Sequence, residues 1–433
     1  MDMISQLPEA LLVKILCSLP TTKEVVATSV LSKQWRSLWK MVPNLKFICN
    51  RGNHLEGFSD SVRRTMLSLE TPCLQSLHLD VSLGQDESID DIGELVGIAC
   101  GLHVRDLVLE LFNPVLKKYP IILDNCQSLE TLRLRGDFGS IALGVPSPLC
   151  LKSLRTLHLL DVFYQDDESV VNLFAGCVRL ENLLVIRSGH DGVETFTIAV
   201  PSLQELTIDD DVYGDSGYVI NSPSLQKLKI KVVEGKTIAS ELIMINAPEL
   251  VEATIWTHDE FQLGESLTSV KRLSLRVNSL MEVPAGSIFK QLEYLQLLTD
   301  YLLSWNPLMV ILDNSPNLQV LEIIGEHDAE LTWEQPTHVP QCLCHLKTLD
   351  WYVTGSTYGK EVAKYILSNA RRLENVVLRI AGCEIEFPWD FPKEERLEVC
   401  HDMEGWCPDG CKFELIVAPF DRDCFFRPSY YGS

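Results

Sequence analysis

One six-residue pattern, Leu-x-x-Leu-x-Leu with conservative replacements, returns along nearly the whole 433-residue chain and constrains its fold more than any local feature. Each copy predicts a short parallel strand, because its fourth and sixth residues face a core while the third, fifth and seventh alternate outward. We expect these strands to stack side by side into one sheet. The 13 copies begin at Leu74, Val104, Leu129, Leu154, Leu180, Leu203, Leu225, Leu250, Val270, Leu292, Leu318, Leu346 and Leu373.

The mean spacing of the copies, about 25 residues, lies in the range of roughly 20 to 29 that is typical of leucine-rich repeats. At about 4.8 Å per strand, thirteen strands extend for roughly 60 Å, which is long enough to bind a folded protein. Residues 170–177 predict a helix between strands, whereas residues 196–201 and 218–223 alternate like strands. We therefore expect an irregular solenoid with mixed return segments, and residues 42–47 fit a degenerate first copy.

The first forty residues carry a large apolar load. Leucine and isoleucine at i, i+4 and i+8 spacings after Pro8 predict an amphipathic helix. We expect Thr21 or Thr22 and then Ser32 to cap two further short helices, the last with two tryptophans. Three short helices cannot bury this much apolar surface, so we expect part of it to bind another chain. The alternative is a cap that packs on the rest of the chain.

These residues follow one another in the order Leu-Pro, the leucine-rich helix, Pro-Thr-Thr-Lys and then Thr-Ser-Val-Leu-Ser-Lys-Gln-Trp-Arg-Ser-Leu-Trp. This order strongly resembles the F-box of plant F-box proteins over roughly residues 4 to 46. The chain departs from the usual pattern at Glu9-Ala10, where an acidic pair is common, and at Gln34, where Arg is common. The resemblance implies docking on a Skp-type adaptor of a cullin-RING ubiquitin ligase. The positions it assigns to adaptor binding are Leu7, Pro8, Ile15, Leu16, Leu31, Trp35 and Trp39.

The stretch from about Cys342 to Cys411 resembles the FBD domain, which follows leucine-rich repeats in many plant F-box proteins. Its order of helix then strand predicts one or two terminal repeats and a cap that covers the last apolar face of the solenoid. The whole chain is thus expected to be an α/β protein with four parts. These are a small three-helix F-box (1–48), an irregular solenoid of about 13 leucine-rich repeats (49–340), an FBD domain with terminal repeats (341–415) and a C-terminal tail (416–433).

Composition limits the possible partners. A net charge of −23 argues against general nucleic-acid binding. No run of 18 apolar residues and no signal peptide appear, so we expect no membrane association and an intracellular protein in the nucleus, the cytoplasm or both. The 14 cysteines are scattered, and we expect them to be reduced thiols, with Cys126 and Cys177 filling the core before repeat strands.

Two short patterns point weakly to chemistry. Gly214-Asp215-Ser216-Gly217 looks like the nucleophile turn of trypsin-like serine proteases, but it lies between repeat strands, and we interpret it as a polar loop. A cysteine- and histidine-containing group near the C-terminus contains zinc-ligand residue types at a spacing that fits no common finger. Phosphate-binding and hydrolase motifs are missing, so we expect no cofactor, no metal and no catalysis. The group comprises Cys400, His401, Cys407, Cys411 and Cys424.

Several outward strand positions are basic although the chain is acidic. The strands that contain residues 227–231 and 272–276 are expected to lie two repeats apart, about 10 Å, with Glu252 on the strand between them. Such a cluster can hold an acidic or phosphorylated segment of a target, and the alternative is ordinary solubilising charge. The residues are Arg133, Arg135, Lys227, Lys229, Lys231, Arg272 and Arg276.

We therefore expect a substrate-receptor subunit of a Skp-cullin-F-box ubiquitin ligase that does no chemistry itself. The F-box would bind the adaptor and the repeat face would bind an unknown target. Three alternatives remain open from the sequence: an interaction scaffold without a ligase role, a hormone co-receptor with a small molecule on the repeat face, and a hydrolase that uses Ser216.

Overall fold

The computed structural model describes most of the chain, and it divides into two compact units. Unit 1 comprises Met1–Leu225 with Leu242–Ala247, and unit 2 comprises Gln226–Glu241 with Pro248–Ser433. Each unit is treated by itself below. The described residues are 7–51, 55–82, 90–112, 119–120, 123, 126–137, 141–145, 147–188, 191–211, 217–232, 243–256, 265–278, 288–301, 305–324, 333–352, 357–381 and 393–418.

Each of the 13 hexamers leads into a parallel strand that begins two residues after the hexamer does, which confirms the predicted repeats. The degenerate copy before them is also a strand, β1, paired in parallel with β2. In unit 1 the strands lie in the order β1 (Asn44–Cys49), β2 (Ser76–Ser82), β3 (Asp106–Phe112), β5 (Thr131–Arg135), β7 (Thr156–Leu160), β9 (Asn182–Arg187) and β11 (Glu205–Asp210).

The strands of unit 2 are also parallel, and they include one that no hexamer predicts. This last strand, β21, pairs in parallel with β20 and runs three residues past the expected end of the FBD domain at residue 415. The order in unit 2 is β13 (Lys227–Val232), β15 (Glu252–Trp256), β16 (Arg272–Asn278), β17 (Tyr294–Tyr301), β18 (Val320–Ile324), β19 (Thr348–Tyr352), β20 (Asn375–Ala381) and β21 (Lys412–Ala418).

The alternation of the hexamer decides which face of the sheet each side chain joins. In the first copy, the fourth and sixth residues, Leu77 and Leu79, are fully buried, whereas His78 between them is half-buried. In-register pairing puts Leu77 beside Leu107 and Leu79 beside Leu109, so equivalent leucines form continuous apolar rows. We call the opposite side of the sheet the open face. It carries the third and fifth hexamer positions and the residue that follows the hexamer.

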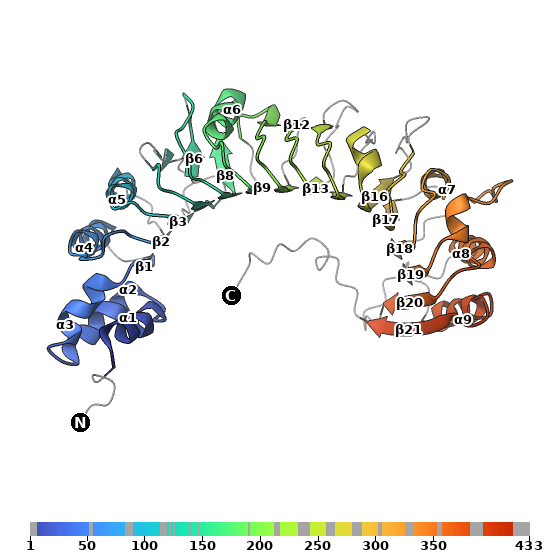
Figure 1. Cartoon of the computed structure of the whole chain (residues 1–433), viewed down its shortest axis with the longest axis horizontal. Coiled ribbons are helices and arrows are strands. Elements are labelled where there is room, and N and C mark those ends of the chain that lie inside the picture. Colours follow the sequence, from blue (N-terminus) through green and yellow to red (C-terminus); the bar gives the residue numbers. More distant parts are fainter. Residues whose placement is uncertain are drawn as a thin grey trace. The chain divides into compact units, whose positions relative to one another are not determined.

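The return segments are mixed, as the sequence predicted. Within each unit the longer helices lie on the side of the strands that carries the buried leucines (Figure 1). Unit 1 has α4 (Leu55–Leu67), α5 (Asp90–Gly101) and α6 (Asp167–Ala175). It also has two three-stranded sheets, β4 (Tyr119–Pro120), β6 (Ile141–Leu143) and β8 (Val162–Tyr164), and β10 (Thr195–Ile198), β12 (Gly217–Asn221) and β14 (Ile243–Asn246). Unit 2 has α7 (Asn306–Asp313), α8 (Thr357–Asn369), α9 (Lys393–Glu404) and 3-10 helices at Glu265–Ser269 and Gln341–Cys344.

Two cysteines correct the expectation that every thiol is reduced. Cys100, near the end of α5, and Cys126, three residues before its hexamer, form a disulfide with a Cα–Cα distance of 5.0 Å. They are 26 residues apart, about one repeat, so stacking brings equivalent return positions of successive repeats together. Cys177, by contrast, is a free buried thiol, as expected of a core residue.

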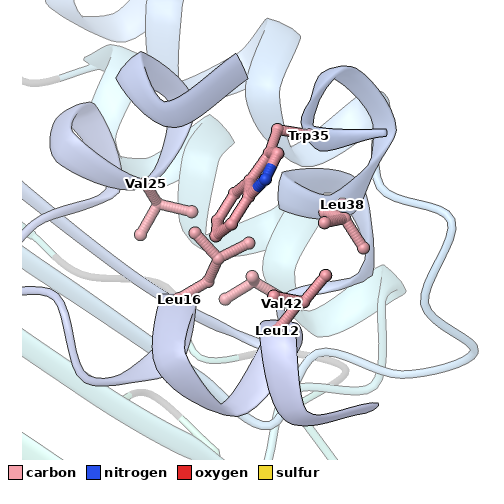
Figure 2. Close-up of a cluster of buried hydrophobic side chains, with 6 residues drawn as sticks. All are labelled: Leu12, Leu16, Val25, Trp35, Leu38 and Val42. Carbon is pink, nitrogen blue, oxygen red and sulfur yellow. The ribbon is translucent and has the colours of Figure 1, made fainter. Parts of the chain in front are cut away.

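The N-terminal helices form their own small core. The helices are α1 (Glu9–Cys17), α2 (Thr22–Ala27) and α3 (Trp35–Leu38), with 3-10 turns at Thr28–Val30 and Trp39–Met41. Of the two predicted caps of α2, Thr21 is the one used, and it forms a capping box with Glu24. Ser32 does not cap α3, because Gln34 is the residue that precedes that helix. Six apolar side chains pack between the helices (Figure 2): Leu12, Leu16, Val25, Trp35, Leu38 and Val42.

This three-helix domain joins the first repeat strand directly. The backbone N–H of Lys46 in β1 donates to Oγ1 of the buried Thr22 at 2.8 Å. Lys40 forms an ion pair of 2.9 Å with Glu70, which follows α4. The domain therefore packs in part on the repeats, as the alternative expectation for its apolar residues, a cap packed on the chain, requires. Whether other apolar residues stay exposed for a partner is decided by the exposure of its side chains, described below.

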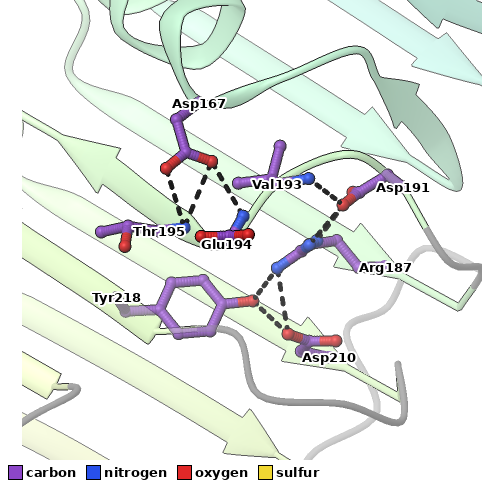
Figure 3. A network of polar contacts seen from close by, with 8 residues as sticks. All are labelled: Asp167, Arg187, Asp191, Val193, Glu194, Thr195, Asp210 and Tyr218. Carbon is purple, nitrogen blue, oxygen red and sulfur yellow. Dashed lines mark hydrogen bonds and ion pairs between the residues drawn. The ribbon is translucent and has the colours of Figure 1, made fainter.

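A buried arginine connects strands β9, β11 and β12 of unit 1 (Figure 3). Arg187 ends β9 at a core position and is only 2% exposed. Its Nη2 pairs with Asp191 at 2.8 Å and its Nη1 with Asp210 of β11 at 3.2 Å. Its Nη1 also donates to the Tyr218 hydroxyl of β12 at 2.9 Å, and its guanidinium lies 5.2 Å from the ring centre of Phe196.

This network is satisfied only while the cation is present. The Tyr218 hydroxyl donates to Asp210, and burial raises the pKa of Tyr218, so the phenol stays protonated. Removing the arginine would leave two carboxylates in the core without a counter-charge.

We predict that Arg187→Ala lowers the free energy of unfolding by about 3 to 5 kcal/mol, because it breaks a buried charge network on one side. Thermal or urea unfolding followed by circular dichroism measures this loss. Arg179→Ala, at an exposed position, is the matched control and should change stability by less than about 0.5 kcal/mol. Equal losses in the two variants would contradict the prediction.

Candidate functional site

The three-helix domain exposes a group of apolar side chains that its own core does not use. Val30 is 86% exposed and Leu31 is 62% exposed, both next to the turn between α2 and α3. Large apolar side chains that stay exposed on so small a domain are candidates for contact with a partner protein. We call this group the F-box surface: Leu11, Ile15, Val30, Leu31 and Met41.

The residues predicted to bind the adaptor separate into two layers. Pro8, Ile15 and Leu31 are exposed, so they are available for contact. Leu16 and Trp35 belong to the buried core in Figure 2 and cannot touch a partner in this conformation. The two that remain, Leu7 and Trp39, are half-buried against that core.

Leu11, Val30 and Met41 belong to the F-box surface but were not among the predicted contacts. Leu11 lies in α1, whereas Val30 and Met41 lie in 3-10 turns, where the helical spacing used to read the sequence does not apply. A simpler sequence feature indicates their exposure: an apolar residue in a short turn has few core side chains within reach.

A second candidate site is the open face of the repeats, where the structure separates the predicted basic residues. In unit 1, Arg133 Nε donates to His158 Nδ1 at 3.3 Å. Arg135 lies 3.9 Å from the Glu110 carboxylate and 5.6 Å from the ring centre of Phe112. Both arginines therefore already have intramolecular partners.

Charge on this part of the open face is internally balanced. His78 Nε2 lies 3.4 Å from Glu110, and that hydrogen bond lowers the pKa of the carboxyl. Burial, followed by repulsion from Glu110, raises the pKa of Asp80. Burial, followed by the positive charge of Arg133, lowers the pKa of His158 to about 4.

The basic residues of unit 2 lie as the repeat spacing predicted. Lys227 pairs in register with Glu252 on β15, and Glu252 pairs with Arg272 on β16. Lys227, Lys229 and Lys231 alternate along the open face of β13. The Arg272 guanidinium stacks 3.9 Å from the ring centre of Tyr294 on β17.

The weaker chemical candidates receive no support. Ser216 and Cys424 lie outside the described residues. Cys400 is buried while the neighbouring His401 is exposed, so the two do not point to a common site. In the described ranges no group of three or more His, Cys, Asp or Glu residues is placed to hold a metal ion. No helix in those ranges is both long and apolar enough to cross a membrane.

Known sequence profiles match all three parts of the chain. The F-box domain profile matches residues 4–47, the profile of the LRR repeats of the FBD-associated F-box protein At5g56370 matches residues 99–263, and the FBD profile matches residues 335–378. A three-helix F-box joined to a parallel repeat sheet and an FBD domain defines an F-box protein with protein-interaction repeats.

Several Arabidopsis thaliana proteins are similar over nearly the full length. The F-box/FBD/LRR-repeat protein At3g26920 is 48% identical over 398 residues, which cover 88% of this chain and 89% of that protein. The F-box/FBD/LRR-repeat protein At3g52680 is 42% identical over 458 residues, which cover 100% of this chain and 95% of that protein. The chain belongs to the plant F-box/FBD/LRR-repeat family.

The depressed pKa of His158 makes a pH dependence testable. As the pH falls below the usual histidine value of 6.5, the unfolded chain takes up this proton first, so stability falls between about pH 6.5 and 4. His158→Gln removes this titration, so its Tm should fall less than that of the wild type between pH 7 and pH 4.5. Calorimetric scans at both pH values check this, and equal decreases would contradict it.

Proposed function

We propose that this chain is the substrate-recognition subunit of a Skp-cullin-F-box E3 ubiquitin ligase. The observation that carries the proposal is the F-box surface, five exposed apolar side chains on a domain whose own core is complete without them. Exposed leucine, isoleucine and methionine side chains lose water favourably when a partner covers them. The membership of the F-box family makes a Skp-type adaptor the partner that we assign.

The two layers of the F-box have different roles in this proposal. Ile15 and Leu31, with Pro8 at the start of α1, contact the adaptor directly. Leu16 and Trp35 fix the angles between the helices and act through those contacts, because both are buried. Leu7 and Trp39 lie at the margin, where half-buried side chains can be covered further by the adaptor.

The chain contributes position rather than chemistry in this proposal. The open face of the repeats would bind a target protein, and the adaptor and cullin would bring a charged conjugating enzyme beside it. Tethering of this kind raises the effective concentration of the two reacting proteins without a catalytic group in the receptor. The complex would work inside the cell, in the nucleus, the cytoplasm or both.

We predict that Ile15→Glu/Leu31→Glu reduces co-purification with a Skp-type adaptor at least tenfold, because two carboxylates would have to be desolvated in the apolar contact. The readout is the amount of adaptor recovered with equal amounts of folded receptor.

The control places the same charge change on other exposed apolar residues of unit 1. Leu67→Glu/Val178→Glu replaces side chains that are 67% and 59% exposed and lie outside the F-box match. This control should retain the adaptor. Full retention by the Ile15/Leu31 variant, or equal loss in both variants, would overturn the assignment.

A further inference from the structure

The open face of unit 2 carries cations that the described part of the chain does not neutralise. Lys229 is exposed on β13, and Arg272 is exposed on β16. Neither forms an ion pair within the described ranges, and the nearest acidic residue in register, Glu252, lies between their strands without a bond to either.

Other open-face arginines show the contrasting arrangement. Arg379 on β20 binds Asp350 with two hydrogen bonds of 2.9 and 2.7 Å. Arg133 and Arg135 have His158 and Glu110. Arg272 instead stacks on Tyr294, which holds its guanidinium flat and leaves the N–H groups at its edge available for an acceptor.

The spacing of the basic residues on this face defines the shape of a ligand. Lys227, Lys229 and Lys231 point to the same side at alternate positions of one strand, so their attachment points are about 6.6 Å apart. Arg272 lies two strands away from Lys227, about 10 Å across the sheet. An extended peptide repeats its side chains with the same period of two residues, so a peptide that lies along β13 can bring an acidic group to Lys229 in register with the strand.

We propose that the open face of unit 2 binds a short, extended acidic segment of a target protein along β13, with one acidic group reaching Arg272. The acidic groups are carboxylates or phosphates, which share the chemistry of accepting charge-assisted hydrogen bonds from lysine and arginine. That the segment belongs to a target rests on the proposed function, whereas the binding itself does not require the adaptor.

Neighbouring charges favour a short peptide over a nucleic acid. On the same face Glu252 lies between the two basic strands, and Glu322 and Asp350 follow on β18 and β19. A polyanion that extended across these strands would meet these carboxylates as well as the cations, and the net charge of the chain would repel it. A segment with a few acidic groups flanked by neutral residues avoids that repulsion.

The test measures binding of defined peptides to the purified full chain by fluorescence anisotropy. The probes are three fluorescein-labelled nine-residue peptides. The first is serine with glutamate at alternate positions, the second is the first with phosphoserine in place of the central glutamate, and the third is serine alone. A single-stranded oligonucleotide of equal charge tests the competing polyanion.

Two variants with the same change in net charge separate this site from general electrostatics. Lys229→Glu/Arg272→Glu reverses the two cations of the site. Lys271→Glu/Lys290→Glu reverses two exposed lysines that lie just before β16 and β17 instead of on the open face. All four side chains are exposed, so neither pair disturbs a core.

We expect both acidic peptides to bind the wild type, the serine peptide not to bind, and the Lys229/Arg272 variant to bind at least tenfold more weakly while the control stays within twofold. The tighter of the two acidic peptides identifies carboxylate or phosphate as the natural group. Tighter binding of the oligonucleotide, equal loss in both variants, or no binding of any acidic peptide by the wild type would overturn the inference.

Adaptor co-purification from the same preparations keeps the two proposals apart. Retained adaptor with lost peptide binding in the Lys229/Arg272 variant supports both. Peptide binding by a wild-type chain that recovers no adaptor would reject the ligase role while the acidic-segment site stands. Adaptor recovery without any acidic-peptide binding would reject the site alone.

Discussion

The rest of the structure depends on one repeated backbone contact between successive repeats. The carbonyl of the second hexamer residue accepts two N–H groups from the next repeat: Arg105 O accepts from Glu130 at 2.8 Å and from Thr131 at 3.0 Å. The pattern recurs where Glu130 O accepts from Arg155 at 2.8 Å and Thr156 at 3.1 Å. Because a slip of one residue would turn every leucine toward solvent, this contact fixes both the register and the open face.

In-register stacking explains why single residues acquire neighbours far away in the sequence. Equivalent positions form rows, so a charge on one strand lies about 4.8 Å from the same position on the next. In one row Arg133 donates a hydrogen bond to His158, and in another the buried Arg187 is paired with carboxylates in the core. On β13 and β16 the exposed Lys229 and Arg272 form no ion pair within the described ranges, which is the charge pattern of a surface that can bind an external anion.

In the F-box too, the sequence identifies apolar positions but not which of them are buried and which can contact a partner. Helical spacing identified the apolar residues of α1, and the sequence placed the cap of α2 at Thr21 or Thr22, of which the structure uses Thr21. Spacing could not tell Ile15, which is exposed, from Leu16, which is buried, since both are apolar and adjacent in one short helix. Which of the two meets a partner depends on where α2 and α3 pack, and that is settled by contacts between residues distant in the chain.

The sequence by itself determined the positions of the strands that follow the 13 hexamers, their parallel arrangement, the alternation of core and open face, and the three-part order of the chain. All of these follow from local periodicity, which a short window of residues contains. Only the tertiary structure decided that Cys100 meets Cys126, that Arg187 is buried among carboxylates, that β21 extends the sheet, and that Arg272 stacks on Tyr294. The physical reason is that each of these depends on which repeat lies beside which and in what register, and no local pattern contains the partner's side chain.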